Sequence, residues 1–438
     1  MAALIAPISA LLMSATLFLT GIGLIGTLLP LRAEIEGFTP SAIGIMGAGY
    51  FAGYVGGCFL WPRAIARVGH IRAFAIASAV LSSAVLVHAI FVTPPVWIGL
   101  RAVAGLCAAG FYLIIESWLN EQTSNDRRGQ VFSLYTALNF GALVVGQMLL
   151  LTAPPGEVVL ILLASMAFAW SIVPLSLTRT GQPSPPVMLR PRLARLYALS
   201  PVGVVGCFLI GVSNGCFWTL APAAMRSVGL SVQEIAFFMS ATILGGALAQ
   251  WPVGRLSDRV DRRLVLVGTM IGTAVVAGVI GVALRLAGPQ GLDTGLVTLG
   301  GALLGACALT GYALCIAHVN DHVQAGDFVE ASSGLLMAFA VGAALGPLLA
   351  GVGGEVARGA APFAVMAVSS AGLAGFALYR ILQRAPIAAA DRTAFVVVPR
   401  TSPKVFALDP RAEGETGATP ASPEGPDAPS RPGTPVAR

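Results

Sequence analysis

Long, continuous runs of apolar residues alternate with short polar loops along most of the chain. Each run is about 20 residues long, which is the length that an α-helix needs to cross the hydrocarbon core of a bilayer. The runs are apolar throughout and do not alternate, so they indicate helices and not the strands of a membrane barrel. We therefore expect twelve transmembrane helices. Their approximate spans are 4–29, 41–62, 71–92, 95–115, 131–153, 157–177, 199–223, 232–254, 263–285, 293–317, 331–353 and 360–380.

Two changes of composition divide the chain into four parts. A polar, proline-rich stretch separates the sixth span from the seventh, and after Arg384 the chain becomes rich in Pro, Gly, Ala, Thr, Ser and Glu. Such a terminal stretch cannot bury enough apolar surface to offset its ordering entropy. We expect a six-helix bundle over residues 1–178, a cytoplasmic linker over 179–198, a second six-helix bundle over 199–384 and a disordered cytoplasmic tail over 385–438.

The composition excludes several classes of protein. Of the 438 residues, 56% are hydrophobic and only 11% are charged, whereas a soluble domain carries about 25% charged residues. This excludes a soluble enzyme, and the scattered basic residues behind the net charge of +6 do not form a nucleic-acid-binding patch. The six cysteines lie in apolar stretches without metal-ligand spacing, so we expect no metal and no cofactor. The partner that the composition does predict is the lipid bilayer.

Loop arginines predict the orientation in the membrane. They are concentrated in the loops after spans 2, 4, 6 and 8, whereas the opposite loops hold only Arg32, Arg226, Arg285 and Arg358. Because basic residues are enriched in cytoplasmic loops, both termini and the central linker are predicted to lie in the cytoplasm. The expected location is the cytoplasmic (inner) membrane.

The two halves of the chain repeat one another at a shift of 200 residues. The matching pairs are Gly105 with Gly305, Cys107 with Cys307, Tyr112 with Tyr312, Asn120 with Asn320, Glu121 with Asp321, and Gly146 with Gly346. A Trp-Pro pair also ends the second and the eighth span. Both halves start on the same side of the membrane, so the pattern predicts a parallel six-plus-six repeat.

Three stretches resemble the major facilitator superfamily of secondary transporters. The segment Gly254-Arg-Leu-Ser-Asp258-Arg-Val-Asp-Arg-Arg263 resembles its loop signature, with Asp261 where the pattern prefers glycine. The equivalent loop of the first half keeps basic residues but lacks the aspartate. Arg101-Ala-Val-Ala-Gly105 resembles a second signature, R-x-x-x-G. The stretch that starts at Glu116, with Arg128-Gly129 and Gly146-Gln147, resembles a bacterial inner-membrane branch whose substrate is poorly defined.

The resemblance covers residue 1 to about residue 384 and implies a function. It implies a monomeric secondary active transporter that moves a small organic solute by alternating access, coupled to protons. Two alternatives remain open, a membrane-embedded lipid-modifying enzyme and a sensor without flux. The identity of the solute and the direction of transport are not readable from the sequence.

Two ionisable residues of the fourth span are candidates for coupling or substrate binding. Arg101 lies inside the span, where a charge costs about 2.5–3.5 kcal/mol on insertion scales and usually faces a cavity. It could hold an anionic substrate or modulate a proton site, or it could reach the outer interface. Glu116 could bind a proton. The favoured alternative is a structural latch, in which Glu116 or Glu121 pairs with Arg63, Arg67 or Arg72.

The signature loop of the second half predicts a cytoplasmic gate. The resemblance implies that Asp258 helps to hold the two halves together on the cytoplasmic side. Neighbouring arginines are placed to meet Asp321, the repeat partner of Glu121. The candidate gate residues are Gly254, Asp258, Arg259, Arg262, Arg263, Glu121 and Asp321. Alternatively, these arginines only set the topology.

Polar and aromatic residues inside the spans are candidate substrate contacts, because a polar group in hydrocarbon needs a partner. They are Tyr50, Tyr54, Tyr112, Asn139, Gln147, Asn214, Trp218 and Tyr312. The alternative interpretation is that many of them only make hydrogen bonds between helices.

Overall fold

The computed structural model describes residues 8–123, 127–177, 183, 192–286, 293–323, 328–357, 359–385, 392–393, 395–397 and 401–402. Every regular element in these ranges is a helix, and twelve helical spans are long and apolar enough to cross a membrane. The predicted all-α membrane fold is therefore confirmed. Most of the predicted tail and most of the predicted linker lie outside the described residues.

Six long helices form the first half. They are α2 (Ser9–Ile35), α3 (Pro40–Val68), α4 (His70–Ile90), α5 (Pro94–Gln122), α6 (Arg128–Leu149) and α7 (Val159–Ser176). A short helix, α8 (Leu193–Leu199), lies in the region of the predicted linker. The second half consists of α9 (Pro201–Ser227), α10 (Val232–Arg259), α11 (Arg262–Leu286), α12 (Thr294–Ala308), α13 (Gly311–Asn320), α14 (Phe328–Gly354) and α15 (Ala361–Gln383).

The tenth span is broken into α12 and α13, which the apolar run did not predict. At the break, the Thr310 hydroxyl donates a hydrogen bond to the Cys307 carbonyl at 3.0 Å. The side-chain amide of Gln250, on α10, donates to the Leu309 carbonyl at 3.2 Å. A threonine bonded to its preceding turn bends a helix, and the Gln250 amide satisfies a carbonyl at the break.

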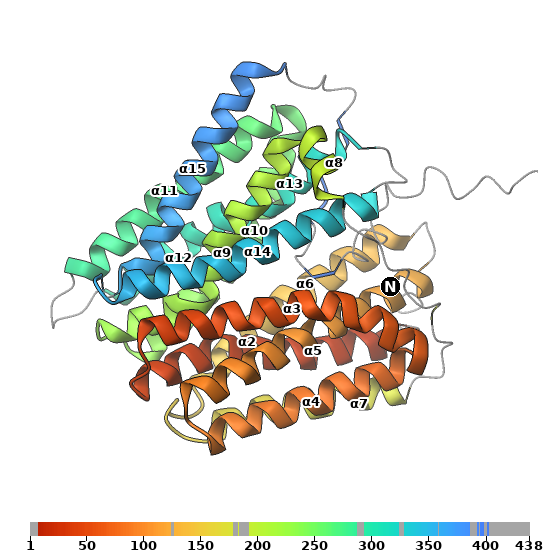
Figure 1. Cartoon of the computed structure of the whole chain (residues 1–438), viewed down its shortest axis with the longest axis vertical. Coiled ribbons are helices and arrows are strands. Elements are labelled where there is room, and N and C mark those ends of the chain that lie inside the picture. The colour runs from red at the N-terminus through yellow and green to blue at the C-terminus, as the bar shows by residue number, and fades with distance from the viewer. Residues whose placement is uncertain are drawn as a thin grey trace, which may run out of the picture.

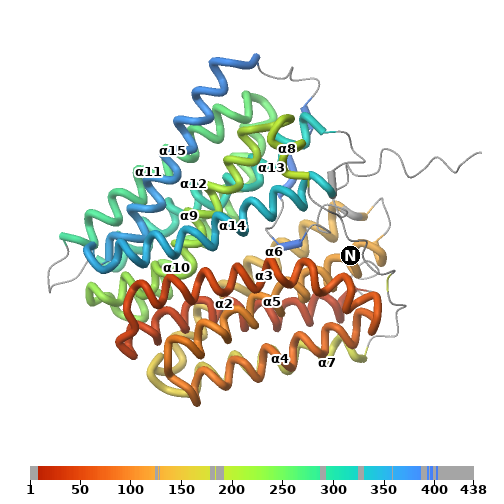
Figure 2. Tube along the Cα trace, in the orientation of Figure 1, coloured from red at the N-terminus to blue at the C-terminus, as the bar shows by residue number. Residues whose placement is uncertain are grey.

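The two halves lie one against the other as separate bundles (Figure 1). The main contacts between them are those of α3 with α14, α2 with α9, and α6 with α10. The first described residues and α8 lie toward the same end of the molecule, as the trace shows (Figure 2). This end carries the loops that the arginine distribution predicts to be cytoplasmic.

Equivalent glycines of the repeat make equivalent helix contacts. A Cβ atom on Gly105 would lie 1.8 Å from the Tyr50 carbonyl oxygen of α3, and one on Gly305 would lie 1.9 Å from the Thr242 carbonyl oxygen of α10. Likewise, Gly146 of α6 packs on the backbone of α2, and Gly346 of α14 packs on the backbone of α9. Small residues at these positions let the helix backbones approach closely, so the sequence repeat corresponds to a repeat of packing.

The halves are in tight contact near the predicted outer end. There, α3 begins and α14 ends, and a Cβ atom on Gly44 would lie 2.3 Å from the Pro347 carbonyl oxygen. Close by, the Ser41 hydroxyl donates a hydrogen bond to the Glu355 carboxylate at 3.0 Å. These contacts close the outer end between α3 and α14.

Replacing Gly105 by leucine is expected to prevent α3 and α5 from packing. The new side chain would meet the α3 backbone, which cannot move aside as a flexible side chain can, so we expect a loss of about 3 kcal/mol or more. Thermal unfolding in detergent would measure this loss. Gly99→Leu on the same helix is the matched control, because a Cβ atom there meets nothing within 4 Å. Equal stability of the two variants would contradict the packing argument.

Candidate functional site

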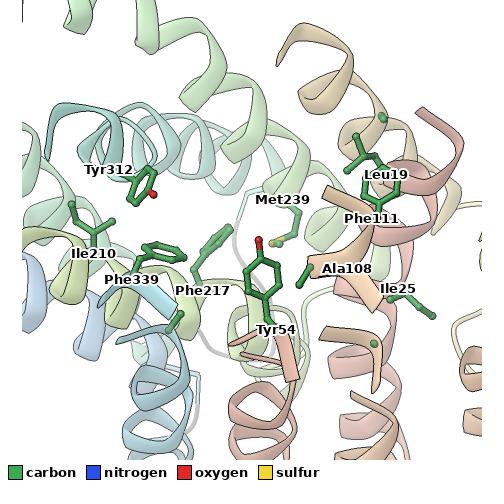
Figure 3. Packing of buried hydrophobic residues seen from close by; sticks show 14 of the residues in the cluster. Leu19, Ile25, Tyr54, Ala108, Phe111, Ile210, Phe217, Met239, Tyr312 and Phe339 are labelled. Atoms are coloured by element: carbon green, nitrogen blue, oxygen red, sulfur yellow. The ribbon is translucent and has the colours of Figure 1, made fainter. Parts of the chain in front are cut away.

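A cavity lies between the two halves. Its lining comes from α2, α3, α5 and α6 of the first half and from α9, α10, α13 and α14 of the second. Its volume is about 230 Å³. Figure 3 shows Tyr54 from the first half, and Tyr312 and Phe339 from the second, among the buried residues of this region. Since both halves contribute, a relative movement of the halves would change the cavity.

Most of the predicted substrate contacts line this cavity. They are Arg101, Tyr50, Tyr54, Tyr112, Asn139, Gln147, Trp218 and Tyr312. Asn214 and Glu116 are not among the lining residues. The buried Asn214 amide donates a hydrogen bond to the Ile210 carbonyl, one turn earlier on α9, at 2.9 Å. Asn214 is thus bonded within its own helix, away from the cavity.

Arg101 places a positive charge at the wall of the cavity. The residue is buried, with 9% of its surface exposed, and its guanidinium carbon lies 4.5 Å from the centre of the Tyr50 ring. No carboxylate among the described residues forms an ion pair with it. A cation over an aromatic face gains about 0.5–2 kcal/mol. The ring is uncharged, so the positive charge of Arg101 still has no neutralising partner among the described residues. The group is therefore suited to an anion in the cavity.

Several buried polar side chains at the cavity have an atom without a hydrogen-bond partner among the described residues. On the helices these atoms include the side-chain carbonyl oxygens of Gln147 and Gln250, the hydroxyl oxygen of Thr136 and the side-chain nitrogen of Asn139. The Gln147 amide nitrogen does have a partner, the Gly23 carbonyl, at 2.8 Å. Buried polar groups are normally hydrogen-bonded, so these atoms are candidates for contact with a solute.

Sequence reasoning missed Thr136 and Gln250. Gln250 immediately precedes the Trp251-Pro252 pair that ends the eighth span, and this repeated pair could have drawn attention to it. Thr136 lies one turn before Asn139 on α6 and carries no comparable signal. A threonine is common inside membrane helices, where it usually bonds to its own backbone.

Glu116 lies in a separate buried position at the end of α5 nearest the gate. Its side chain is completely buried and accepts a hydrogen bond from the Tyr135 hydroxyl of α6 at 3.1 Å. It also accepts one from the Ser402 hydroxyl. Among the described residues, no ion pair joins Glu116 to Arg63, Arg67 or Arg72. The observed contacts therefore do not include the favoured latch for Glu116. Glu121 is exposed at the end of the same helix.

The second half brings several of the candidate gate residues together. Arg262 Nε lies 2.7 Å from Asp321 Oδ2, and Arg262 Nη2 lies 3.4 Å from Asp258 Oδ1. Arg262 is almost completely buried, and the Asp321 side chain is 3% exposed. These ion pairs connect α10, α11 and α13, all within the second half. Arg259 is exposed beside them.

A second ion pair fixes the turn between α10 and α11. Arg263 Nη2 lies 2.7 Å from Asp261 Oδ2, and the Arg263 backbone N–H donates to Asp261 Oδ1 at 2.9 Å. Burial favours the neutral acid, but these hydrogen bonds outweigh it and hold the pKa of Asp261 below its usual range. The aspartate that replaces the usual glycine of the signature therefore has a structural role, which is to anchor the start of α11.

Comparison with protein families shows a match over nearly all of the membrane part. The model described as Major Facilitator Superfamily matches residues 11–198 and 203–412. The MFS-type transporter YcaD of Escherichia coli O139:H28 (strain E24377A / ETEC) is 29% identical over 348 residues, which cover 77% of this chain and 86% of that protein. The MFS-type transporter Ent638_1421 of Enterobacter sp. (strain 638) is 28% identical over 352 residues, or 78% of this chain and 87% of that protein.

Solved transporter structures share the fold. The nucleoside transporter NupG aligns with a TM-score of 0.71 at 14% identity, over 85% of this chain and 98% of that chain. A bacterial homologue of the iron transporter ferroportin, in an inward-facing state, aligns with a TM-score of 0.63 at 14% identity, over 87% and 98%. The E. coli fucose:proton symporter FucP aligns with a TM-score of 0.53 at 13% identity, over 86% and 98%. At these sequence identities, the similarities show that the chain shares the fold of these transporters.

Proposed function

Because the chain belongs to the Major Facilitator Superfamily, whose members carry solutes through the cavity between their halves, we propose that it transports a small organic anion across the cytoplasmic membrane. The observation that carries this proposal is Arg101, a buried cation at the cavity wall with no carboxylate partner among the described residues. An anionic solute would supply the missing charge. Removing charges from water is costly unless they are paired, so the buried charge of Arg101 favours an anion over a neutral or cationic solute.

The rest of the lining narrows the chemical class further. Two amide oxygens, of Gln147 and Gln250, are available to accept hydrogen bonds. Apolar and aromatic side chains, such as Phe51 and Phe339, cover the remaining wall. A solute that matches this lining has an acidic group, one or two hydroxyl or amino donors, and an apolar body. Small hydroxylated or aminated organic acids have this combination.

Glu116 is the proposed proton site. Its carboxyl group is buried between α5 and α6, with hydrogen-bond partners and no cation beside it among the described residues. An ionisable residue inside a membrane helix is by default a functional candidate, and a carboxyl group can gain and lose a proton during the cycle. Arg101 and Glu116 lie on the same helix but too far apart to touch, about 22 Å along it. Arg101 could then respond to the organic anion and Glu116 to a proton.

Alternating access would use the contacts at the two ends. The tight packing of α3 on α14 supports a state that is closed on the outside. The Arg262 pairs with Asp321 and Asp258 keep the ends of three helices together as one unit that could move as a whole. In this proposal the linker, both termini and the gate face the cytoplasm, and one monomer is the transporting unit.

The proposal is tested by ligand binding followed by flux. Purified full-length protein would be screened by thermal shift against small organic acids, each paired with its neutral primary amide. At 100 times the dissociation constant, a binding acid should add about 2.7 kcal/mol of stability, and its amide should add almost none. Hits would then be tested as labelled solutes in liposomes, with and without a proton gradient. Stabilisation by amides and acids alike would contradict the anion site, and binding without flux both in the full chain and in a chain that ends at residue 391 would identify a sensor instead.

A further inference from the structure

Part of the C-terminal tail lies against the gate of the second half. The backbone N–H and the hydroxyl of Thr393 both donate hydrogen bonds to Asp321 Oδ1, at 2.9 Å and 2.8 Å. The backbone N–H of Phe395 donates to Asp258 Oδ1 at 2.9 Å. Both gate aspartates are therefore bound at the same time by the tail and by Arg262.

An aromatic side chain fixes the tail to α10. The ring of Phe395 lies so close to Gly254 that a Cβ atom there would be 2.3 Å from its Cδ1 atom. Val396 also packs against the buried core, and Val397 is among the residues that line the central cavity. The glycine of the loop signature thus provides the flat surface on which the tail ring rests.

The last described residues of the tail reach the first half. Thr401 and Ser402 are buried, with 5% and 3% of their surface exposed. The Tyr54 hydroxyl donates a hydrogen bond to the Thr401 carbonyl, and the Ser402 hydroxyl donates one to the Glu116 carboxylate. The described part of the tail therefore contacts the gate of the second half, the cavity, and the proposed proton site of the first half.

These contacts occupy the groups that a transport cycle would need. We name the described residues 392, 393, 395–397, 401 and 402 the tail segment, and the region between Asp258, Asp321 and Glu116 the mouth. Thr393, Phe395 and Ser402 each donate a hydrogen bond to one of the three acids of the mouth, and the Thr393 carbonyl accepts one from Arg262. A solute that enters or leaves between these groups would have to displace the tail segment.

We propose that the tail segment is an autoinhibitory plug, which binds in the mouth and blocks access to the cavity from the cytoplasm until it is released. The effect on transport rests on the function proposed above, whereas the docking itself does not. The segment is covalently attached, so its high effective concentration allows a weak contact to be well occupied. Release by any factor that binds the tail would then switch the transporter on.

The test measures access to the cavity and needs no substrate. Ala340 lines the cavity and is buried, and Ala340→Cys would be labelled with a membrane-impermeant maleimide in inside-out vesicles. The same chain without this change gives the background from the native cysteines. In the otherwise unaltered full chain we expect slow labelling. Ser176→Cys, at the exposed end of α7, shows that the reagent has reached the protein.

Phe395→Asp in the full chain should release the plug. It removes the ring from Gly254 and places a third negative charge beside Asp258 and Asp321, so labelling of the cavity cysteine should become about tenfold faster. Leu382→Asp is the matched control, because Leu382 is 87% exposed on α15, and it should leave labelling slow. A synthetic peptide of residues 392–402, added to the Phe395→Asp protein, should restore protection.

Two results would overturn the plug. One is labelling of Ala340→Cys in the full chain as fast as that of Ser176→Cys. The other is an unchanged slow rate in both Phe395→Asp and a chain that ends at residue 391, provided that this shortened chain keeps its thermal stability. Because labelling requires no solute, a failure of the anion flux experiments would leave this result intact, and the reverse also holds.

Discussion

Arg101→Ala is expected to abolish binding and transport of the organic anion while the protein still inserts and folds. The guanidinium provides the charge at the cavity wall for which the described residues offer no carboxylate partner. Truncating one member of a buried charge pair costs about 2–5 kcal/mol, which is a loss of roughly 30-fold to several thousand-fold in affinity. Titration of the best acid from the thermal-shift screen would measure the loss.

Two arginine variants make the Arg101 experiment specific. Arg101→Lys keeps the charge but not the planar guanidinium that stacks on Tyr50, so we expect partial retention of binding. Arg285→Ala removes an arginine from the exposed end of α11 and should bind as the parent does. Unchanged anion affinity in Arg101→Ala would exclude Arg101 from the site. Loss of thermal stability without ligand would instead assign it a role in packing.

Glu116→Gln is expected to uncouple transport from the proton gradient. Glutamine keeps an oxygen that can accept the hydrogen bonds of Tyr135 and Ser402 but cannot exchange a proton. Accumulation of labelled anion against its gradient should therefore fall to the background, whereas exchange of internal for external anion should continue. Liposome assays of driven uptake and of exchange, made on the same preparation, measure the two activities.

The neighbouring tyrosine provides the control for Glu116. Tyr135→Phe removes one hydrogen bond to the carboxylate and leaves the proton-binding group, so driven uptake should persist with an altered pH profile. Driven uptake that survives Glu116→Gln at the parental rate would contradict the proton role. Loss of exchange as well as of driven uptake would show that Glu116 acts on the gate or the fold.

The sequence predicted the elements of the fold well because membrane spans depend on local composition. Each apolar run forms a helical span, and the tenth span is broken into α12 and α13. The glycine pairs of the repeat make equivalent contacts between helices. The break in the tenth span was not predictable from hydropathy, since the run is apolar on both sides of Thr310 and Gly311. The carbonyl of Leu309 at the break is satisfied by Gln250, which is distant in sequence and meets Leu309 only in the folded chain.

The site was predictable by residue type but not by contact. Aromatic and amide residues inside spans were candidates because they need partners, and most of them line the cavity. Which helix faces turn inward depends on packing, so Asn214 was included and Thr136 was missed. For Glu116, nearness to the loop arginines suggested an ion pair, whereas its observed partners come from α6 and from the tail. The tail contains one signal of such a contact, the short apolar run of residues 394–398, which its otherwise polar composition concealed.

The break between α12 and α13 gives the second half a property that the first half lacks. In the first half, Arg101 and Tyr112 share one uninterrupted helix, α5. In the second, Tyr312 in the cavity and Asp321 at the mouth lie at the two ends of α13, a helix of 10 residues, and are separated by about 14 Å along its axis. The break separates this short helix from α12, which ends at Ala308. The cavity residue Tyr312 and the gate residue Asp321 are thus held by one short helix, so any displacement of α13 as a rigid body would move both.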